Sequence, residues 1–282
     1  MKNDITVHCV VKNEERWIWF AINSIVDIAD KVLVYDTGST DKTIHIIKTI
    51  KSKKIIFEEK GEVDAKGLAQ LRKEQLSRTK TEWFLILDGD EVWMEETKKE
   101  LIKKIKSADK SSWGIVARAW NLVGDVYHYH PESIHYHWPY APKDYKGWAN
   151  LRVFRKSIPG LHIRGEYPLE AYCGNDETPI QNYGEKHLLF LKNRYFHTTY
   201  LTRSDTRAMD RKVLNRLKKS KMELGFSFPK NFKYPGVFYK KLPRTVTSPW
   251  NKRSNLESFV SLVQTPIKEA RRRVFGLYNP KS

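Results

Sequence analysis

Short hydrophobic runs alternate with amphipathic stretches over the first third of the chain. Runs rich in β-branched and aromatic residues, each too short to cross a bilayer, predict buried strands at 5–11, 31–36, 53–59 and 83–88. Apolar residues spaced three or four positions apart predict helices at 13–29, 43–51 and 64–80. Because consecutive parallel strands need a crossover, this order predicts an α/β fold with a Rossmann-like, mostly parallel sheet flanked by helices.

The pattern is less regular after residue 95. Extended segments and aromatic, loop-like stretches fill residues 113–200, and we expect them to complete one domain over residues 1–202. The remaining residues, 203–282, are expected to form a basic extension of helical and irregular segments. A helix is predicted over 204–224, with Ser204 as its N-cap.

A second basic helix is predicted over 265–275, with Pro266 in its first turn. Helical spacing places Ile267, Ala270 and Val274 on the inward face and the neighbouring lysine and arginines outward. Basic amphipathic helices of this kind lie at anionic membrane interfaces, so contact with a membrane surface is one expectation. A solvated helix docked on its own domain is the alternative.

The charge is concentrated in that extension. The formal net charge is +18, and residues 201–282 contain 20 Lys plus Arg against 5 Asp plus Glu, a net of +15. An excess of this size indicates a polyanionic partner, which can be nucleic acid, anionic lipid or a phosphorylated substrate.

Cysteine usage and hydropathy bear on the compartment. The two cysteines, Cys9 and Cys173, are far apart and lack the spacing of a zinc site or a disulfide framework. No apolar run is long enough for a signal peptide or a membrane span of about 20 residues. We therefore expect a cytoplasmic protein, with peripheral contact at the inner face of the membrane as an extension of that expectation.

Carboxylates follow two of the predicted strands. Asp36 ends the second strand, and Asp88 and Asp90 follow the fourth, separated by Gly89. Ligands of such sheets bind at the carboxyl ends of the strands, where Asp36 can accept hydrogen bonds from a nucleoside and the later pair can hold Mn²⁺ or Mg²⁺ on a diphosphate. The alternatives are a helix-entry loop after residue 36 and an ordinary acidic turn after residue 87.

Four segments in this order resemble the family 2 glycosyltransferases with the A-type, nucleotide-sugar-binding fold. They are "VHCVVKNEERWI", "KVLVYDTGSTDKT", "GLAQLRKEQL" and "EWFLILDGDE". The resemblance is strong over residues 4–95 and looser over 113–200. It implies a nucleotide-sugar half at about 1–95 and an acceptor half at about 96–202.

The same resemblance implies roles for individual residues. Asp36 would contact the nucleoside, Val11 and Glu14 would line its pocket, and Arg72 would lie beside the nucleotide. Asp88 and Asp90 would form the DxD-type motif, in which Asp90 binds the divalent cation and Asp88 positions the nucleotide sugar. A late histidine often joins the metal ligands of such enzymes, and His197 is placed to do so.

The catalytic base and the leaving-group cations are expected in the acceptor half. An inverting transfer needs a carboxylate that deprotonates the acceptor hydroxyl, and Glu166 and Glu170 are the candidates. Relatives place a glutamate after a strand that begins "RxFR", matched here by residues 152–155, which favours Glu170. Arg152 or Arg155 would help to neutralise the departing nucleotide.

These observations favour a metal-dependent glycosyltransferase that moves a sugar from a nucleotide-diphosphate donor to a glycan or lipid-linked hydroxyl. A nucleotidyltransferase shares such a sheet, but its glycine-rich first loop is replaced here by "VVKNEER". A nucleic-acid-binding protein would fit the charge, although no recognised binding motif accompanies it.

Overall fold

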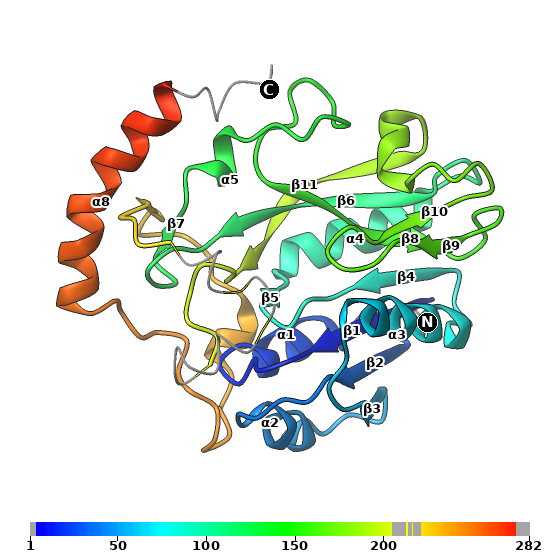
Figure 1. The fold of residues 1–282 in the computed structure, drawn as a ribbon, viewed down its shortest axis with the longest axis horizontal. Helices are drawn as coiled ribbons and strands as arrows, with labels where there is room; N and C mark the ends of the chain where they lie inside the picture. The colour runs from blue at the N-terminus through cyan, green and yellow to red at the C-terminus, as the bar shows by residue number, and fades with distance from the viewer. Residues whose placement is uncertain (1–3, 205–212, 214–215, 217–220, 275–282) are drawn as a thin grey trace.

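One eight-stranded sheet runs through the molecule (Figure 1). The structure is a computed structural model that describes residues 4–204, 213, 216 and 221–274. The strands follow one another across the sheet in the order β3 (Ile55–Glu59), β2 (Lys31–Asp36), β1 (Ile5–Val11), β4 (Trp83–Ile86), β8 (Ala149–Arg155), β6 (Gly114–Asn121), β11 (Leu188–His197) and β5 (Glu91–Val92).

The two halves of the sheet differ in strand direction. Strands β3, β2, β1 and β4 are all parallel, as their alternation with helices predicts. Strand β8 is antiparallel to both β4 and β6, β11 is parallel to β6, and β5 is antiparallel to β11. The predicted α/β class, a large sheet flanked by helices, is confirmed, and its second half is a mixed sheet.

Side chains that alternate along each strand pack against different layers. On β2, Val32 and Val34 join the main core, which also contains apolar residues of α1 (Ile18–Ile25), α2 (Thr43–Thr49) and α4 (Glu95–Ser107). Leu33 and Tyr35 face the opposite side, where they pack with Leu71 of α3 (Ala65–Arg78). The strands of the first half are therefore covered on both faces, and this explains their near-continuous hydrophobicity.

Helix α1 begins later than the hydrophobic pattern predicts. Asn13 has a φ of 54°, which an α-helix does not accommodate, and the helix starts only at Ile18. Residues 13–17 therefore form a turn at the carboxyl end of β1, and this turn carries Glu14 to the edge of the sheet.

Shorter elements complete the body of the molecule. They are β7 (His128–Tyr129), α5 (Glu132–His135), the hairpin of β9 (His162–Arg164) and β10 (Ala171–Cys173), and the 3₁₀ helix η1 (Ile180–Lys186).

The C-terminal extension folds onto the body through aromatic residues. Strand β12 (Phe226–Ser227) pairs with β7, and the 3₁₀ helix η2 (Gly236–Tyr239) follows it. Phe196 of β11 stacks against Phe228 and Phe232 of the extension. The helix predicted over 204–224 lies largely outside the described residues.

Helix α8 (Asn255–Val274) stands at the edge of the molecule and is longer than the predicted helix (Figure 1). It begins where Ser254 and Glu257 cap each other: the Glu257 carboxylate accepts from the Ser254 backbone N–H, and the Ser254 hydroxyl accepts from the Glu257 N–H. The prediction that Pro266 occupies the first turn is therefore wrong, because this capping box starts the helix earlier. None of the helices in the described ranges is both long and apolar enough to cross a bilayer.

Candidate active site

A cavity of about 750 Å³ opens at the carboxyl ends of β1 and β4. Its size lies within the range of about 300–1,000 Å³ that is typical of small-molecule sites. Charged side chains from both halves of the sheet and from the start of the extension line it, and these are Lys12, Glu14, Glu62, Asp64, Arg72, Asp88, Asp90, Arg152, Glu170, His197, Arg203 and Arg216.

The "DGD" turn after β4 brings two carboxylates to this cavity. Asp88 and Asp90 both line it, with Gly89 between them. A Cβ atom added to Gly89 would lie 2.8 Å from Cγ of Glu14. The glycine is therefore needed because the turn passes close to the Glu14 side chain.

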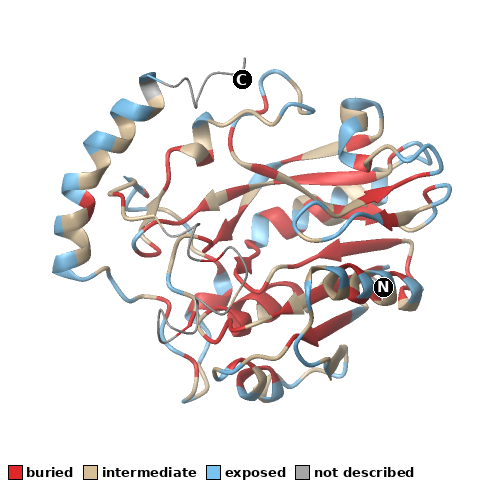
Figure 2. Cartoon of the chain, in the orientation of Figure 1, coloured by how far each residue is buried: buried red, intermediate tan, exposed pale blue. Residues whose placement is uncertain are grey.

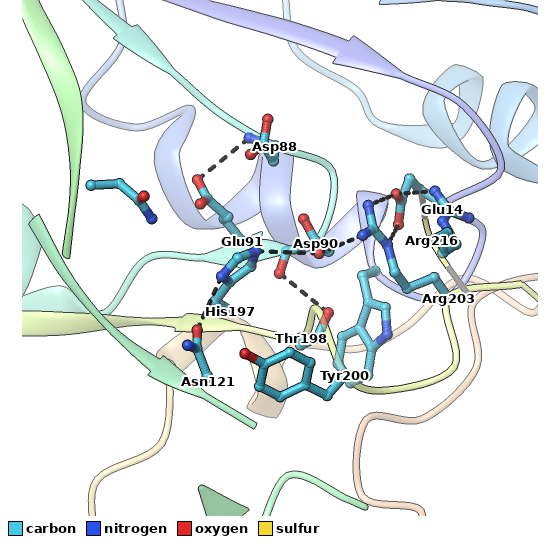
Figure 3. Close-up of polar contacts among 12 residues, drawn as sticks. Glu14, Asp88, Asp90, Glu91, Asn121, His197, Thr198, Tyr200, Arg203 and Arg216 are labelled. Atoms are coloured by element: carbon cyan, nitrogen blue, oxygen red, sulfur yellow. Dashed lines mark hydrogen bonds and ion pairs between the residues drawn. The ribbon is translucent and has the colours of Figure 1, made fainter. Parts of the chain in front are cut away.

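Asp90 faces His197 at the end of β11 (Figure 3). Nε2 of His197 lies 3.5 Å from Oδ2 of Asp90, and Nδ1 lies 3.1 Å from Oδ1 of Asn121. The amide orientation of Asn121 is fixed because its Nδ2 donates to Glu132 at 2.6 Å. A neutral His197 then carries its proton on Nδ1 and directs the lone pair of Nε2 toward Asp90.

Arg152 of β8 joins Asp88 to Glu91. Its Nη2 lies 2.8 Å from Oδ2 of Asp88 and also contacts the fully buried Glu91 carboxylate. Burial raises the pKa of Glu91 to about 7, although the charge of Arg152 opposes the shift. Burial also acts to raise the pKa of Asp88, but Arg152 and Arg72 outweigh it and bring that pKa below its usual value.

Two arginines of the extension reach the same cavity, and no sequence motif indicates them. Arg203 binds both carboxylate oxygens of Glu14 and places Nη1 2.8 Å from Oδ2 of Asp90. Arg216 donates to Glu14 at 2.6 Å. Burial raises the pKa of Glu14 above its usual value, while the charges of these arginines act in the opposite direction. The two arginines follow Glu14 by nearly the length of the domain, so local spacing could not have predicted the contact.

The candidate bases occupy different environments. Glu170 lines the cavity and lies 3.3 Å from Nε of Arg72, while its second oxygen, Oε2, is buried and has no hydrogen-bond partner in the described part of the chain. Glu166 is exposed and is not among the residues that line the cavity. Only Glu170 is therefore positioned with the other candidate residues.

The remaining predicted residues are divided between the cavity and its supports. Val11 lines the cavity at the end of β1. Asp36 is buried, and its carboxylate accepts hydrogen bonds from the backbone N–H groups of Gly38 and Ser39, so it shapes the loop that carries Thr37 to the cavity. Arg155 is not brought to the cavity, because its guanidinium stacks over the ring of Trp83.

Asp90 and His197 are the side chains that would hold a divalent cation in this cavity. A carboxylate oxygen and an imidazole nitrogen 3.5 Å apart, with the lone pair of that nitrogen directed at the carboxylate, are a suitable pair of ligands for Mn²⁺ or Mg²⁺. Within the described residues, no cluster of three or more His, Cys, Asp or Glu side chains could hold an ion unaided. Oxygens of a bound diphosphate would therefore have to complete the shell.

Comparison with known proteins identifies the family. Residues 6–157 match the family described as Glycosyl transferase family 2, which is more than half of the chain. An uncharacterized glycosyltransferase of Rickettsia typhi, RT0209, is 38% identical over 97 residues. The glycosyltransferase SunS from the SPbeta prophage of Bacillus subtilis is 30% identical over 99 residues.

The matches with these relatives are partial. They cover 34% and 35% of this chain, and 31% and 23% of the respective relatives. Among solved structures, S. aureus TarS residues 1–349 give a TM-score of 0.46 at 19% identity, covering 69% of this chain and 60% of that one. Glucosyl-3-phosphoglycerate synthase from Mycobacterium tuberculosis, crystallised with Mn²⁺ and UDP-glucose, gives 0.32 at 20% identity, covering 42% and 43%. TM-scores this low carry no weight for the function of this chain.

The family match, in contrast, decides the class of protein. The chain belongs to glycosyl transferase family 2. The resemblance that its sequence motifs suggest is therefore confirmed.

Proposed function

We propose that this chain transfers a sugar from a nucleotide-diphosphate sugar to a hydroxyl group, with a divalent cation and with inversion at the anomeric carbon. The observation that supports it best is the cavity that brings together Asp88, Asp90, His197, Arg152 and Glu170 at the carboxyl ends of the strands. Family membership favours this reaction over nucleotidyl transfer or nucleic-acid binding.

The cavity contains the charges that a nucleotide diphosphate requires. Lys12, Arg72, Arg152, Arg203 and Arg216 line it and can balance the phosphate oxygens. Asp90 and His197 would hold Mn²⁺ or Mg²⁺, which when bound neutralises charge that develops on the leaving diphosphate. We assign the nucleoside to the side of the cavity formed by Val11, Glu14 and the loop supported by Asp36.

Glu170 is the proposed catalytic base. Its carboxylate removes the proton from the acceptor hydroxyl as that oxygen bonds to the anomeric carbon, and the bond from the same carbon to the diphosphate oxygen breaks. The nucleoside diphosphate leaves with the bonding electron pair on the face opposite to attack. The Arg72 guanidinium, 3.3 Å away, holds the carboxylate in place.

The acceptor is proposed to be a glycan or a lipid-linked sugar. The enzyme would meet a lipid-linked acceptor at the cytoplasmic face of the membrane, and the basic extension over 203–282 is the proposed contact region. The excess of 20 Lys plus Arg over 5 Asp plus Glu after residue 200 supports this assignment, because anionic lipid attracts such a segment.

A panel of sugar nucleotides tests the reaction. The purified chain is incubated with UDP- and GDP-sugars, with and without Mn²⁺ or Mg²⁺, and the released nucleoside diphosphate is measured together with the thermal shift. At least one donor should stabilise the protein and be hydrolysed only with metal. Indifference to every donor in the presence of both metals would refute the proposal.

Paired variants test the base. Glu170→Gln should lower turnover by about 10²–10⁴-fold, the usual contribution of a general base, without changing the donor-induced thermal shift. Glu166→Gln is the matched control and should leave turnover within about threefold of wild type, because Glu166 is exposed and lies outside the cavity lining. The reverse ranking would transfer the role to Glu166.

A further inference from the structure

Helix α8 is amphipathic, but its apolar face points away from the protein. Six of its seven large hydrophobic residues are more than half exposed, and Val260 is of intermediate exposure: Leu256 (73%), Phe259 (65%), Leu262 (58%), Val263 (51%), Ile267 (54%) and Val274 (77%). From Leu256 to Ile267 they recur at helical spacing, and Val274 lies two turns beyond Ile267 on the same face, so the six form one stripe along the helix. Figure 2 shows the exposed residues of α8 along its full length at the edge of the molecule.

This arrangement reverses the orientation that the sequence predicts. Helical spacing predicts that Ile267 and Val274 face inward, and both are exposed. The opposite side of the helix, which faces the body, is polar, and Ser261 on that side is buried. The prediction of an inward apolar face is therefore wrong.

Specific polar contacts explain the reversed orientation. Arg272 and Lys268 form ion pairs with Glu223, a carboxylate that is 2% exposed. The Thr265 hydroxyl accepts a hydrogen bond from the backbone N–H of Leu224 at 2.9 Å. His130, which belongs to the body of the protein, places Nε2 3.3 Å from Oε2 of the same Glu223. A buried carboxylate without its cations is costly, so these pairs hold the polar face inward and leave the apolar stripe outside.

We infer that the outer stripe of α8 is a docking surface for an anionic lipid membrane. An exposed apolar stripe that contains an aromatic residue and has basic residues near both ends is suited to the boundary between headgroups and acyl chains. Lys252 and Arg271 are exposed near the two ends of the helix, where they can meet lipid phosphates. The helix would lie flat, with the stripe in the acyl boundary and the polar face on the enzyme.

A second copy of the chain fits this surface less well. A helix of 20 residues is about 30 Å long, and its stripe is at most about 10 Å wide. Two such stripes would bury roughly 600 Å² in total, whereas stable interfaces bury about 1,200–2,000 Å². A formal charge of +18 on each copy would also oppose association, while the same charge favours an anionic bilayer.

Vesicle binding tests the docking surface directly. The full chain is sedimented with vesicles of phosphatidylcholine alone and of phosphatidylcholine mixed with phosphatidylglycerol. We expect binding to the mixed vesicles, weakened when NaCl is raised from about 0.1 M to about 0.5 M, because salt screens the lipid charge. Absence of binding to the mixed vesicles would overturn the inference.

Matched variants separate the stripe from general charge. Phe259→Ser combined with Leu262→Ser should weaken binding to the mixed vesicles by at least about tenfold, because two apolar side chains no longer enter the acyl boundary. Tyr140→Ser removes an exposed aromatic residue outside the extension and should change binding less than about twofold. Equal binding by the double variant and wild type would overturn the assignment to α8.

Further measurements distinguish membrane docking from misfolding of the double variant and from self-association of the chain. Circular dichroism and the thermal midpoint should match wild type, because both replaced side chains are exposed. If light scattering without vesicles shows a wild-type dimer that the double variant converts to a monomer, a second copy covers the stripe and the inference is overturned. Donor hydrolysis in the same samples should be unchanged by the double variant, so the docking surface and the proposed reaction can fail independently.

Discussion

The cavity and helix α8 depart from the usual rule of burial in opposite ways. Carboxylates at the cavity and behind it, such as Glu14 and Glu91, are buried, whereas α8 exposes Leu256, Phe259 and Val274. Burying carboxylates costs free energy that their paired arginines offset within the chain, and exposing a row of apolar side chains costs free energy that contact with another surface would offset. We relate the charged groups to the proposed nucleotide-diphosphate donor and the apolar row of α8 to the proposed membrane contact.

The largest expected effect concerns the charged side of this comparison. Asp90→Asn should reduce kcat/KM for donor turnover by about 10³-fold, because the variant loses a carboxylate beside the proposed cation and next to Arg203. The control Asp144→Asn changes an exposed aspartate and should retain activity. Turnover by Asp90→Asn that equals wild type and still requires Mn²⁺ would remove Asp90 from the metal site.

The next effect contrasts α1 with α8. Ile22 of α1 is fully buried, and Ile22→Ala should lower the free energy of unfolding by about 2–5 kcal/mol. Ile267→Ala on α8 removes the same atoms from a side chain that is 54% exposed, and it should change that free energy by less than about 0.5 kcal/mol. Urea unfolding of the two variants checks the contrast, and a similar loss in both would show that the α8 stripe is buried in solution.

The third prediction concerns the pH dependence of stability. The carboxyl of Glu91 has an ordinary pKa of 4.5 and a pKa of about 7 in the fold. Between these values the folded state binds more protons than the unfolded state, so the free energy of unfolding falls as pH rises, by about 3 kcal/mol in total.

Glu91→Gln cannot ionise and should remove this contribution. Urea unfolding of wild type and variant between pH 4.5 and 8 measures the difference in slope. Glu96→Gln, an exposed position on α4, is the control and should keep the wild-type slope. Parallel curves for Glu91→Gln and wild type would show that Glu91 ionises in the fold as it does in the unfolded chain.

The smallest expected effect concerns the positioning of His197. Asn121→Leu removes the oxygen that lies 3.1 Å from Nδ1, so the ring loses the contact that fixes its tautomer. Affinity for Mn²⁺, measured by electron paramagnetic resonance, should fall by about 10-fold to 100-fold. Nitrogen NMR of the imidazole should show a mixture of tautomers in the variant, and an unchanged single tautomer would contradict the role of Asn121.

The parallel half of the sheet could be predicted from the sequence because its signals are local. The hydrophobic runs of β1 and β2 coincide with the observed strands, and the carboxylates after β4 lie at the cavity as expected. Burial on both faces makes such strands continuous apolar runs, and the positions that follow them are fixed by the sheet.

The contacts that local patterns do not predict depend on long-range partners. Arg203 reaches Glu14 and Asp90 from the extension, and no spacing rule connects these positions. The orientation of α8 is unpredictable for a related reason. Helical periodicity shows that the helix has two faces, but the ion pair of Arg272 with the distant Glu223 decides which one turns inward.

The close approach at Gly89 limits how this site can vary. Because a single added carbon there would overlap the side chain of residue 14, a larger residue at 89 would be tolerated only with a smaller one at 14. Replacing Glu14 by a smaller residue would also deprive Arg203 and Arg216 of the carboxylate that they share. The size of residue 89 thus constrains residue 14 and, through it, Arg203 and Arg216. Natural variation at these four positions should be correlated.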